Sequence, residues 1–399
     1  MKARIQTPIW TGNIDSESPT LRTTGILGSL RWWTESLLRG INKQACDPTS
    51  RENCPDEKEK IKYYCLACLI FGATGLSKSF KSRIDCKCSP VFVGTPINIK
   101  PENRRRGWYL GSGLVGKFEL SFLPLVKSFE EALVEIPLAI ASKWGGMGAK
   151  TQLGYGVFQL EGYPADTDIQ SFLNALKSIQ HRLEFVQNAK FRDYVPNSEE
   201  YPNIRDFFFA KMQFESLDDW WKGVDGIGKR NRYSSQAYDR EVEKWIESGS
   251  VPIAPAIKNW IRFGKLVRNR KGKEIPVSPF KEIYNPEISK WLFGDMSQRI
   301  ASKINISSAY RMSDNIWEFR IWGWVPESKR GFRKGEFLHS LRTSLANSYN
   351  EVMIPWNNLL GNKAKKMKLI SWRQFNSDND TEGKEHDIYK YIDSLLEEV

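Results

Sequence analysis

The 399-residue chain places all six of its cysteines in one short segment near the N-terminus. Four of them stand in a polar, charged stretch with the spacing C-x7-C-x10-C-x2-C. Thiolates in a segment with few apolar residues are typical of a structural zinc site, because metal–sulfur bonds replace the missing hydrophobic core. We therefore predict one zinc ion bound by Cys46, Cys54, Cys65 and Cys68. The alternative is a set of free thiols, with Cys68 buried beside Leu69.

The remaining two cysteines, Cys86 and Cys88, alternate with charged residues and share a strand face with Ile84. We predict that they are small core residues, as free cysteines often are. A secreted disulfide framework would spread cysteines along the chain, so the clustering indicates a metal site in a reducing compartment, or a local redox pair.

A second segment whose residues could bind a ligand is "KWGGMGAKTQLGYG", residues 143–156. It contains five glycines and two lysines but no acid. Backbone N–H groups that no side chain screens form concave anion-binding nests. The loop leaves a helix and opens a strand, so it is neither a P-loop nor a dinucleotide fingerprint. We predict that it binds an extended phosphodiester backbone through Lys143, Gly145, Gly146, Gly148 and Lys150. The alternative is a helix C-cap followed by a tight connection.

The overall charge supports a polyanionic partner. Lys and Arg number 59 against 47 Asp and Glu, a net charge of +12, which favours nucleic acid first and an anionic membrane second. Further candidate nucleic-acid contacts are Arg31, Trp32, Lys78, Lys81, Arg83, Lys229, Arg230 and Arg232, and the run Arg104, Arg105 and Arg106. For the basic runs the alternative is a solvated loop, and for Arg31 and Trp32 it is an acid partner and packing on their own sheet.

Cleavage of RNA without a metal usually needs a general base and a general acid, most often histidine. The chain has three histidines, His181, His339 and His386, and none is adjacent to the glycine loop or the first helix. We therefore predict a binding protein rather than an enzyme.

Hydrophobic periodicity predicts the elements that position these residues. The order strand, helix, strand, strand, helix, strand occurs twice, which is the ferredoxin-like pattern of RNA-recognition modules. The first copy spans 2–10, 26–41, 82–94, 116–125, 128–144 and 156–163; the second spans 206–217, 255–269, 303–312, 315–325, 335–352 and 367–375. The predicted fold is α+β, with two tandem ferredoxin-like domains at 1–162 and 204–399, an insertion at 43–68, a connector at 163–203 and a short acidic tail at 393–399.

A local repeat marks the duplication. "LIFGATGLSKSFKSRI" at 69–84 corresponds to "WLFGDMSQRIASKI" at 291–304, since both place Phe-Gly and then a basic loop before the third element. Phe71 and Phe293 are expected to anchor each loop in its core. The basic residues that follow are then free to face a ligand.

Four motifs, "TPIWTGN", "LRTTGILGSLRWWTESLL", "LIFGATGLSKSFKSRI" and "GGMGAKTQLGYG", occur in that order. They resemble the motifs of the RAMP superfamily of CRISPR proteins, and most of all the first-numbered subunits of Cmr complexes, the type III-B RNA-guided effectors. The resemblance is sharp over residues 1–160. Gln152 and Leu153 depart from it, because members of the family often place further arginine there.

The resemblance implies a non-catalytic subunit that holds guide RNA near its 3′ end, and target RNA, beside other RAMP subunits of the complex. It carries the glycine loop over to Gly145, Gly146, Gly148, Gly154 and Gly156, with Lys150 as its basic residue. The alternatives are a RAMP endoribonuclease that processes guide precursor and a protein-interaction scaffold. With no signal sequence and no apolar run of membrane-spanning length, we expect a cytoplasmic protein without a membrane partner.

Overall fold

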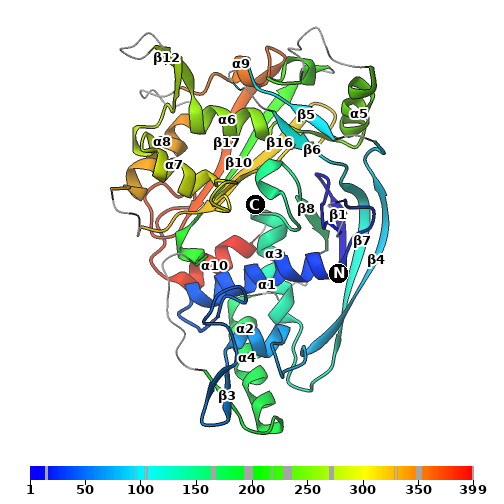
Figure 1. The fold of residues 1–399 in the computed structure, drawn as a ribbon, viewed down its shortest axis with the longest axis vertical. Coiled ribbons are helices and arrows are strands. Elements are labelled where there is room, and N and C mark those ends of the chain that lie inside the picture. The colour runs from blue at the N-terminus through cyan, green and yellow to red at the C-terminus, as the bar shows by residue number, and fades with distance from the viewer. Residues whose placement is uncertain are drawn as a thin grey trace.

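A computed structural model gives the fold of the chain (Figure 1). The structure describes residues 1–13, 17–94, 96–102, 104, 107–162, 168–192, 201–216, 219–227, 236–268, 274–327, 329, 331–346 and 353–397. Arg105, Arg106, Lys229, Arg230 and Arg232 lie outside these residues. The fold is α+β, with several separate sheets.

The first half of the chain forms a four-stranded antiparallel sheet in the order β4-β7-β1-β8, with α1 and α3 in the two crossovers. The predicted strand–helix–strand–strand–helix–strand order is therefore confirmed for this half. The apolar stripe predicted on the first helix is also confirmed, because its tryptophan, Trp33, is only 2% exposed. The bounds are β1 (Lys2–Ile5), α1 (Thr23–Gly40), β4 (Phe80–Pro90), β7 (Leu114–Pro124), α3 (Ala132–Trp144) and β8 (Phe158–Glu161).

The second half repeats this strand order in a larger antiparallel sheet. Its six strands run β11-β15-β16-β10-β17, and β14 also pairs with β16. β14 and β15 together take the place of one strand, the one predicted at 303–312. The bounds are β10 (Phe207–Ser216), β11 (Ser250–Val251), α6 (Ala254–Phe263), α7 (Pro286–Phe293), β14 (Ile304–Ile306), β15 (Ala309–Arg311), β16 (Ile316–Trp324), α8 (Lys334–Leu345) and β17 (Ala364–Gln374).

The break between β14 and β15 is a contact between the two halves. The amide of Ser308 donates to the carbonyl of Gly154, 3.0 Å away, and Gly154 bridges Ser307 in parallel. The strand is interrupted where the glycine loop of the first half approaches it.

The two Phe-Gly repeats have the same geometry. Phe71 and Phe293 are both buried, as predicted, and each precedes a glycine with positive φ, +83° at Gly72 and +85° at Gly294. In each copy a backbone amide beyond the loop, of Ser79 or Lys303, donates back to the last turn of the short helix before the glycine. The first of these helices is α2 (Leu66–Phe71), and the second is α7.

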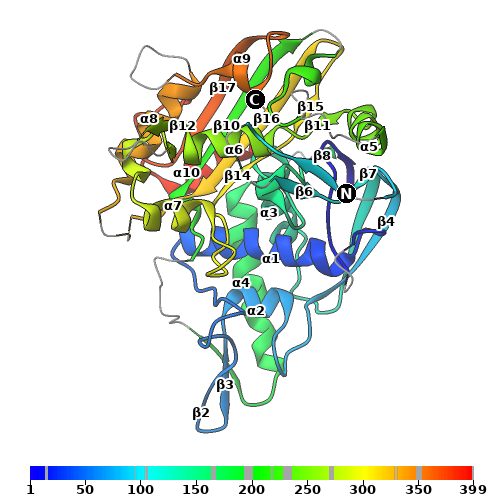
Figure 2. The same ribbon diagram turned by 45° about the horizontal axis from the view of Figure 1, so that its top comes forward.

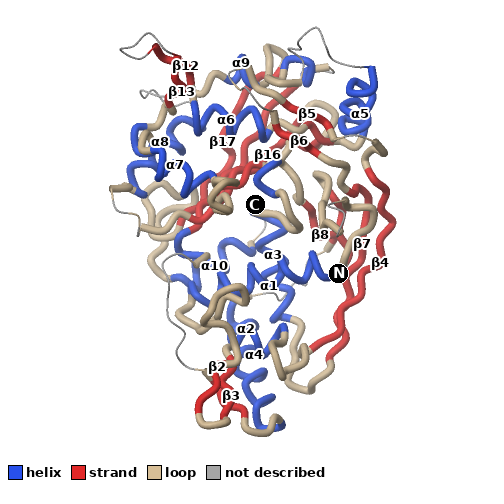
Figure 3. The backbone as a smooth tube through the Cα atoms, in the orientation of Figure 1, coloured by secondary structure: helices blue, strands red, loops and turns tan. Residues whose placement is uncertain are grey.

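Helices separate the two sheets (Figures 1 and 3). Side chains of β10 alternate between two cores: Phe207 and Phe209 pack with α1 and α3, whereas Phe208 and Met212 pack with α6, α7 and α8 on the other face. A strand buried on both faces reads as a continuous apolar run, which is how "DFFFAKM" reads. Helices α1 and α3 of the first half therefore pack against both sheets.

The cysteine-bearing insertion lies at the end of the molecule away from the second sheet (Figure 2). Its hairpin, β2 with β3, pairs in parallel with β9, a strand from the predicted connector. The connector also contains α4, which packs against α2 and α3. The bounds are β2 (Asp56–Lys58), β3 (Ile61–Tyr64), α4 (Ile169–Gln180) and β9 (Ala189–Phe191).

The prediction of an acidic tail was wrong for residues 393–396, which belong to α10 (Ile388–Leu396). The apolar face of this helix, including Leu395, is buried in the core of the first half. The indole N–H of Trp144 donates to the carbonyl of Leu395 at 2.8 Å. Asp393, together with the acidic residues that follow the helix in the sequence, concealed the apolar stripe from a reading of composition.

Peripheral elements complete the described fold. They are β5 (Ile97–Ile99) paired with β6 (Trp108–Leu110), α5 (Gln236–Glu247), β12 (Lys265–Arg268) paired with β13 (Glu274–Val277), and α9 (Trp356–Leu359). Among the described helices, none has the length and apolar character needed to cross a bilayer.

We predict that Leu395→Ala lowers the free energy of unfolding by about 2–5 kcal/mol, because it opens a cavity in the core of the first half. Tyr389→Ala on the exposed face of the same helix is the matched control and should change it by no more than about 0.5 kcal/mol. Urea unfolding measures both. Equal effects of the two variants would contradict the packing of α10 into this core.

Candidate nucleic-acid interface and metal centre

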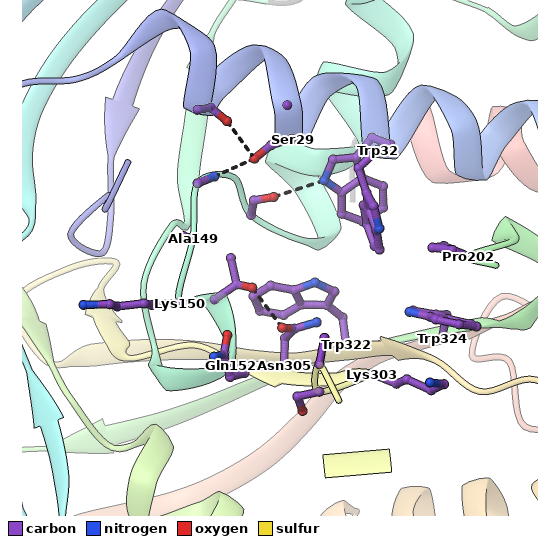
Figure 4. A pocket seen from close by; sticks show the side chains of 18 of the residues that line it. Ser29, Trp32, Ala149, Lys150, Gln152, Pro202, Lys303, Asn305, Trp322 and Trp324 are labelled. Carbon is purple, nitrogen blue, oxygen red and sulfur yellow. Dashed lines mark hydrogen bonds between the residues drawn. The ribbon is translucent and has the colours of Figure 1, made fainter. Parts of the chain in front are cut away.

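A cavity of about 890 Å³ opens between the two halves of the molecule. One wall is α1 together with the glycine loop, and the other is the second Phe-Gly loop with β14 and β16 (Figure 4). Of the predicted nucleic-acid contacts, the structure brings Trp32, Gly146, Gly148 and Lys150 to this cavity.

The glycines of the loop are required by close packing. A Cβ at Gly145 would lie 2.3 Å from the ring of Trp33, and one at Gly146 would lie 2.9 Å from the carbonyl oxygen of Gly156. Both glycines also approach Trp322 from the second sheet. The loop thus passes between tryptophans of the two halves, and only residues without a side chain fit there.

Most loop amides are satisfied inside the protein. The Gly148 amide donates to Ser29 Oγ at 2.8 Å, and the Met147 amide donates to the carbonyl of Gly156 at 2.9 Å. Gly145 and Ala149 donate to the carbonyls of Ala141 and Trp10. The predicted direct contact between the Gly148 amide and phosphate does not agree with this geometry. In the described part of the chain the Gly146 amide has no such acceptor.

Three cationic side chains line the cavity: Lys150, Arg299 and Lys303. Lys150 Nζ lies 3.7 Å from the centre of the Trp10 ring, and partial burial lowers the pKa of this amine. Arg299 is exposed, whereas Lys303 is 9% exposed and lies over the rings of Trp291 and Trp324. Asp47 is the single carboxylate among the described lining residues, so the cavity favours anions.

The other predicted contacts lie elsewhere. Lys81 and Arg83 are on the open, charged face of β4, and Lys78 is in the loop before it. Gly145 lies in the glycine loop beside the cavity and is not part of its lining. Lys143 turns away, because its Nζ donates to the carbonyls of Leu396, the last residue of α10, and of Glu397, which follows it.

Arg31 faces the cysteine segment rather than the cavity. Its guanidinium donates to Glu35 at 2.7 Å and, through Nη2, to Cys68 Sγ at 3.4 Å. Burial opposes its charge, but Cys68 and Glu35 together raise its pKa above the ordinary value. The acid partner weighed for Arg31 is therefore present.

The four predicted ligands form a compact cluster. The sulfurs of Cys46, Cys54, Cys65 and Cys68 lie within 4.8 Å of one another, and all four residues are buried. Zinc–thiolate bonds of about 2.3 Å in a tetrahedron match such a cluster. The donor set therefore can hold a metal ion such as zinc.

Hydrogen-bond donors and positive charges around the cluster would stabilise the cysteines in their thiolate form. The amides of Cys46 and Cys65 donate to the sulfurs of Cys65 and Cys54 at 3.3 and 3.4 Å. Arg31 approaches one side of the cluster, and Arg192 Nη1 lies 3.9 Å from Cys54 Sγ on another. Four thiolates carry more negative charge than a divalent ion neutralises, and these two guanidiniums offset the excess.

Cys86 and Cys88 are half-buried on the core side of β4, and the structure joins them in a disulfide. The prediction of two small core residues gave their face correctly and missed their pairing. They take no part in the four-cysteine cluster.

None of the three histidines lines the cavity between the halves. His181 and His386 are exposed, and His181 lies 2.9 Å from Glu184. His339 borders a separate cavity of about 530 Å³, where its Nδ1 lies 3.0 Å from Asn379 Oδ1.

Sequence reasoning missed the cavity residues that come from the second half, which include Arg299, Lys303, Asn305, Trp322 and Trp324. Arg299 and Lys303 lie inside the second Phe-Gly repeat. The expectation that the basic residues of this repeat face a ligand could therefore have identified them. The tryptophans had no such marker, because an apolar strand gives no indication of which ring borders a cavity.

Behind this wall, Lys258 on α6 is 5% exposed and donates to Ser302 Oγ at 3.0 Å. Burial lowers the pKa of Lys258 to about 7, and the nearby charge of Arg262 adds to this effect. Ser302 lines the cavity, so the loop that forms the wall is tied to a lysine that is half-neutral near pH 7.

Comparison with known proteins finds a match to a family model within the first half. Residues 2–159 match the family model described as the RAMP superfamily. No curated protein matches the sequence. Among solved structures, a crystal structure of Cmr1 from Pyrococcus furiosus in its apo form matches at 13% identity, over 83% of this chain and 88% of that one, with a TM-score of 0.32. That similarity is too low for residue roles to be carried over.

We predict about one zinc per chain by elemental analysis, lost in Cys68→Ser and retained in Cys88→Ser, which removes a cysteine outside the cluster. A chelator should lower the melting temperature of the natural protein and leave that of Cys68→Ser unchanged, because metal binding stabilises the folded state. Metal-free natural protein with the same melting temperature as the loaded form would contradict the site.

We predict that Lys258→Met flattens the pH dependence of stability. The unfolded amine has a pKa near 10.5 and the folded one about 7, so between these values the unfolded state binds more protons and stability rises with pH. Between pH 7 and pH 10, the free energy of unfolding should therefore rise more for the natural protein than for Lys258→Met. Urea unfolding measures both. Lys244→Met, at an exposed site, is the control; a parallel pair of curves for Lys258→Met would show that Lys258 is charged in the fold.

Proposed function

We propose that this chain is an RNA-binding subunit of a type III-B CRISPR effector complex. The match of residues 2–159 to the RAMP superfamily model supports this proposal. In this proposal both halves are ferredoxin-like domains, as their matching strand orders suggest. The chain holds guide RNA near its 3′ end, or target RNA, beside other RAMP subunits of a Cmr complex.

The observation that carries the proposal is the cavity between the halves. It combines cations with tryptophan rings, the pairing by which proteins bind single strands through backbone charge and base stacking. The opening, about 890 Å³ in volume, is bordered by segments from both halves, so a strand within it contacts both at once.

We propose binding without cleavage. The described lining residues include no histidine, and their one carboxylate, Asp47, already accepts from the amide and hydroxyl of Thr49 at 2.8 and 2.7 Å. General acid–base transfer needs a group within hydrogen-bond reach of the reacting hydroxyl. The zinc proposed at the cysteine cluster is structural, since four protein ligands leave no open coordination position.

We predict that the purified protein binds single-stranded RNA with an affinity that falls steeply with salt. Lys150→Gln should weaken binding and reduce the slope of log K against log salt by about 0.7, the value for one phosphate contact on a single strand. Lys244→Gln on α5, outside the cavity, is the control of equal charge change. Filter binding of labelled RNA at several salt concentrations measures the slopes.

Two outcomes would count against the proposal. Identical salt slopes for Lys150→Gln and Lys244→Gln would remove the cavity from the RNA path. Discrete RNA products on a denaturing gel, formed by the natural protein in the presence of EDTA, would favour the endoribonuclease alternative.

A further inference from the structure

Three cationic side chains meet on helix α6, outside the lining of the cavity. Lys258 and Arg262 are four residues apart on this helix and therefore share a face. Arg104 reaches them from the segment between β5 and β6, in the first half of the chain. Its guanidinium lies 4.2 Å from the centre of the Phe263 ring, and that of Arg262 lies 4.9 Å from the same ring. One aromatic ring thus brings cations from both halves together.

Within the described part of the chain, carboxylates do little to balance this charge. Burial lowers the pKa of Arg104, and no acidic group among the described residues opposes the effect. Burial and the charge of Arg104 also lower the pKa of Arg262, although Asp295 acts in the other direction. Asp295 is itself shared, because it accepts from the amide and hydroxyl of Ser297 and lies 3.7 Å from Lys290. The cluster of Arg104, Arg262 and Lys258 therefore carries a net positive charge.

The same side chains have hydrogen-bond donors to spare. Lys258 donates to Ser302 Oγ at 3.0 Å. Arg262 donates through Nε to Ser289 Oγ at 3.3 Å. Among the described residues, the guanidinium of Arg104 has no acceptor, and its Nε is buried. An ammonium has three N–H donors and a guanidinium five, so a ligand with several acceptor oxygens fits the donors that remain.

The end of a helix accounts for part of this arrangement. Arg262 lies in the last turn of α6, where the helix dipole favours positive charge. That dipole is equivalent to about half a charge, which is too little to offset three cations. Lys258 is only 5% exposed, so water screens its repulsion from Arg262 poorly. An anion bound between the cations relieves this repulsion.

The cluster borders the loop that forms one wall of the cavity. Ser302, which accepts from Lys258, also lines the cavity, and so do Arg299 and Lys303 of the same loop. Cations therefore line the cavity on one side of this loop and gather on α6 beside it. A polyanion in the cavity has the cluster within the width of one loop.

We propose that Arg104, Arg262 and Lys258 form a second phosphate site, which binds the backbone of single-stranded RNA outside the cavity. Phosphate supplies negative charge and acceptor oxygens together, and the guanidinium fork matches its geometry. The site needs both halves of the chain, since Arg104 comes from one and α6 from the other. This proposal rests on the proposed function and extends it to a further stretch of the strand.

The test is filter binding of labelled single-stranded RNA by the full-length protein at several salt concentrations. Arg104→Gln and Arg262→Gln should each weaken binding and reduce the slope of log K against log salt by about 0.7, the value for one phosphate contact on a single strand. Arg104→Lys should keep the slope of the natural protein, because it keeps the charge.

Arg311→Gln is the matched control. Arg311 is an exposed arginine 5.1 Å from the centre of the Trp317 ring, and it lies outside the cavity lining and the cluster. The control variant loses the same charge and the same kind of ring contact as Arg104→Gln. Melting temperatures measured without RNA show whether each variant is folded. An inactive fraction that does not vary with salt shifts log K equally at every salt concentration and leaves the slope unchanged.

The outcomes separate the two proposals. If Arg104→Gln and Arg262→Gln both keep the slope of Arg311→Gln, the second phosphate site is overturned. RNA binding at the cavity stays in place in that case, provided that Lys150→Gln still reduces the slope. An Arg104→Lys protein with the reduced slope of Arg104→Gln would also overturn the site, because it would show that charge at this position is not what RNA binds. No binding of RNA by the natural protein would overturn the proposed function and this site with it.

Discussion

The end of helix α3 is where the two halves of the molecule are joined. Arg320 of β16 donates to the carbonyl of Ser142 at 2.6 Å and to that of Gly145 at 3.3 Å. In the same place the indole of Trp33 donates to the carbonyl of Gly146 at 3.1 Å. These bonds satisfy the carbonyl of Ser142, in the last turn of the helix, and those of the first two loop residues, Gly145 and Gly146. The last carbonyls of a helix have no partner within the helix, so they need such outside donors. The cavity exists because this seam fixes the glycine loop against the second sheet.

The two Phe-Gly loops share one backbone geometry but lie in different surroundings. The first Phe-Gly loop lies beside the cysteine cluster, where the carbonyl of Gly72 accepts from Arg31 at 3.2 Å. The second lies at the cavity and presents Arg299 and Lys303. Both keep the same backbone at the glycine, so the difference lies in the side chains and in the neighbouring helix. One copy therefore borders the cysteine cluster, and the other borders the cavity proposed to bind RNA.

The features that could be predicted from the sequence are those set by residues close together in the chain. Trp33 and Leu37 share a helical stripe, and both are buried. The cysteine cluster was predictable because a polar segment with four thiols has few other ways to be stable. The role of the glycines was not, since the contact of Gly145 with Trp33 and Trp322 joins residues far apart in the chain. For Arg31 the acid partner, Glu35, lies one helical turn away and was weighed from the sequence, whereas its contact with Cys68 was not predictable because the two residues are close only after folding.

Helix α10 has a consequence for how the protein is made. Its residues 388–396 follow the whole second sheet in the sequence, yet they complete the core of the half that is synthesised first. Arg373 fixes the helix from the second sheet, donating to Ser394 Oγ at 2.6 Å. When residues 1–162 have been synthesised, this half therefore still has an open apolar face, and the face stays open until residues 388–396 have followed. Transiently exposed apolar surface of this kind makes a partly synthesised chain prone to aggregate, a hazard that two independent domains would not share.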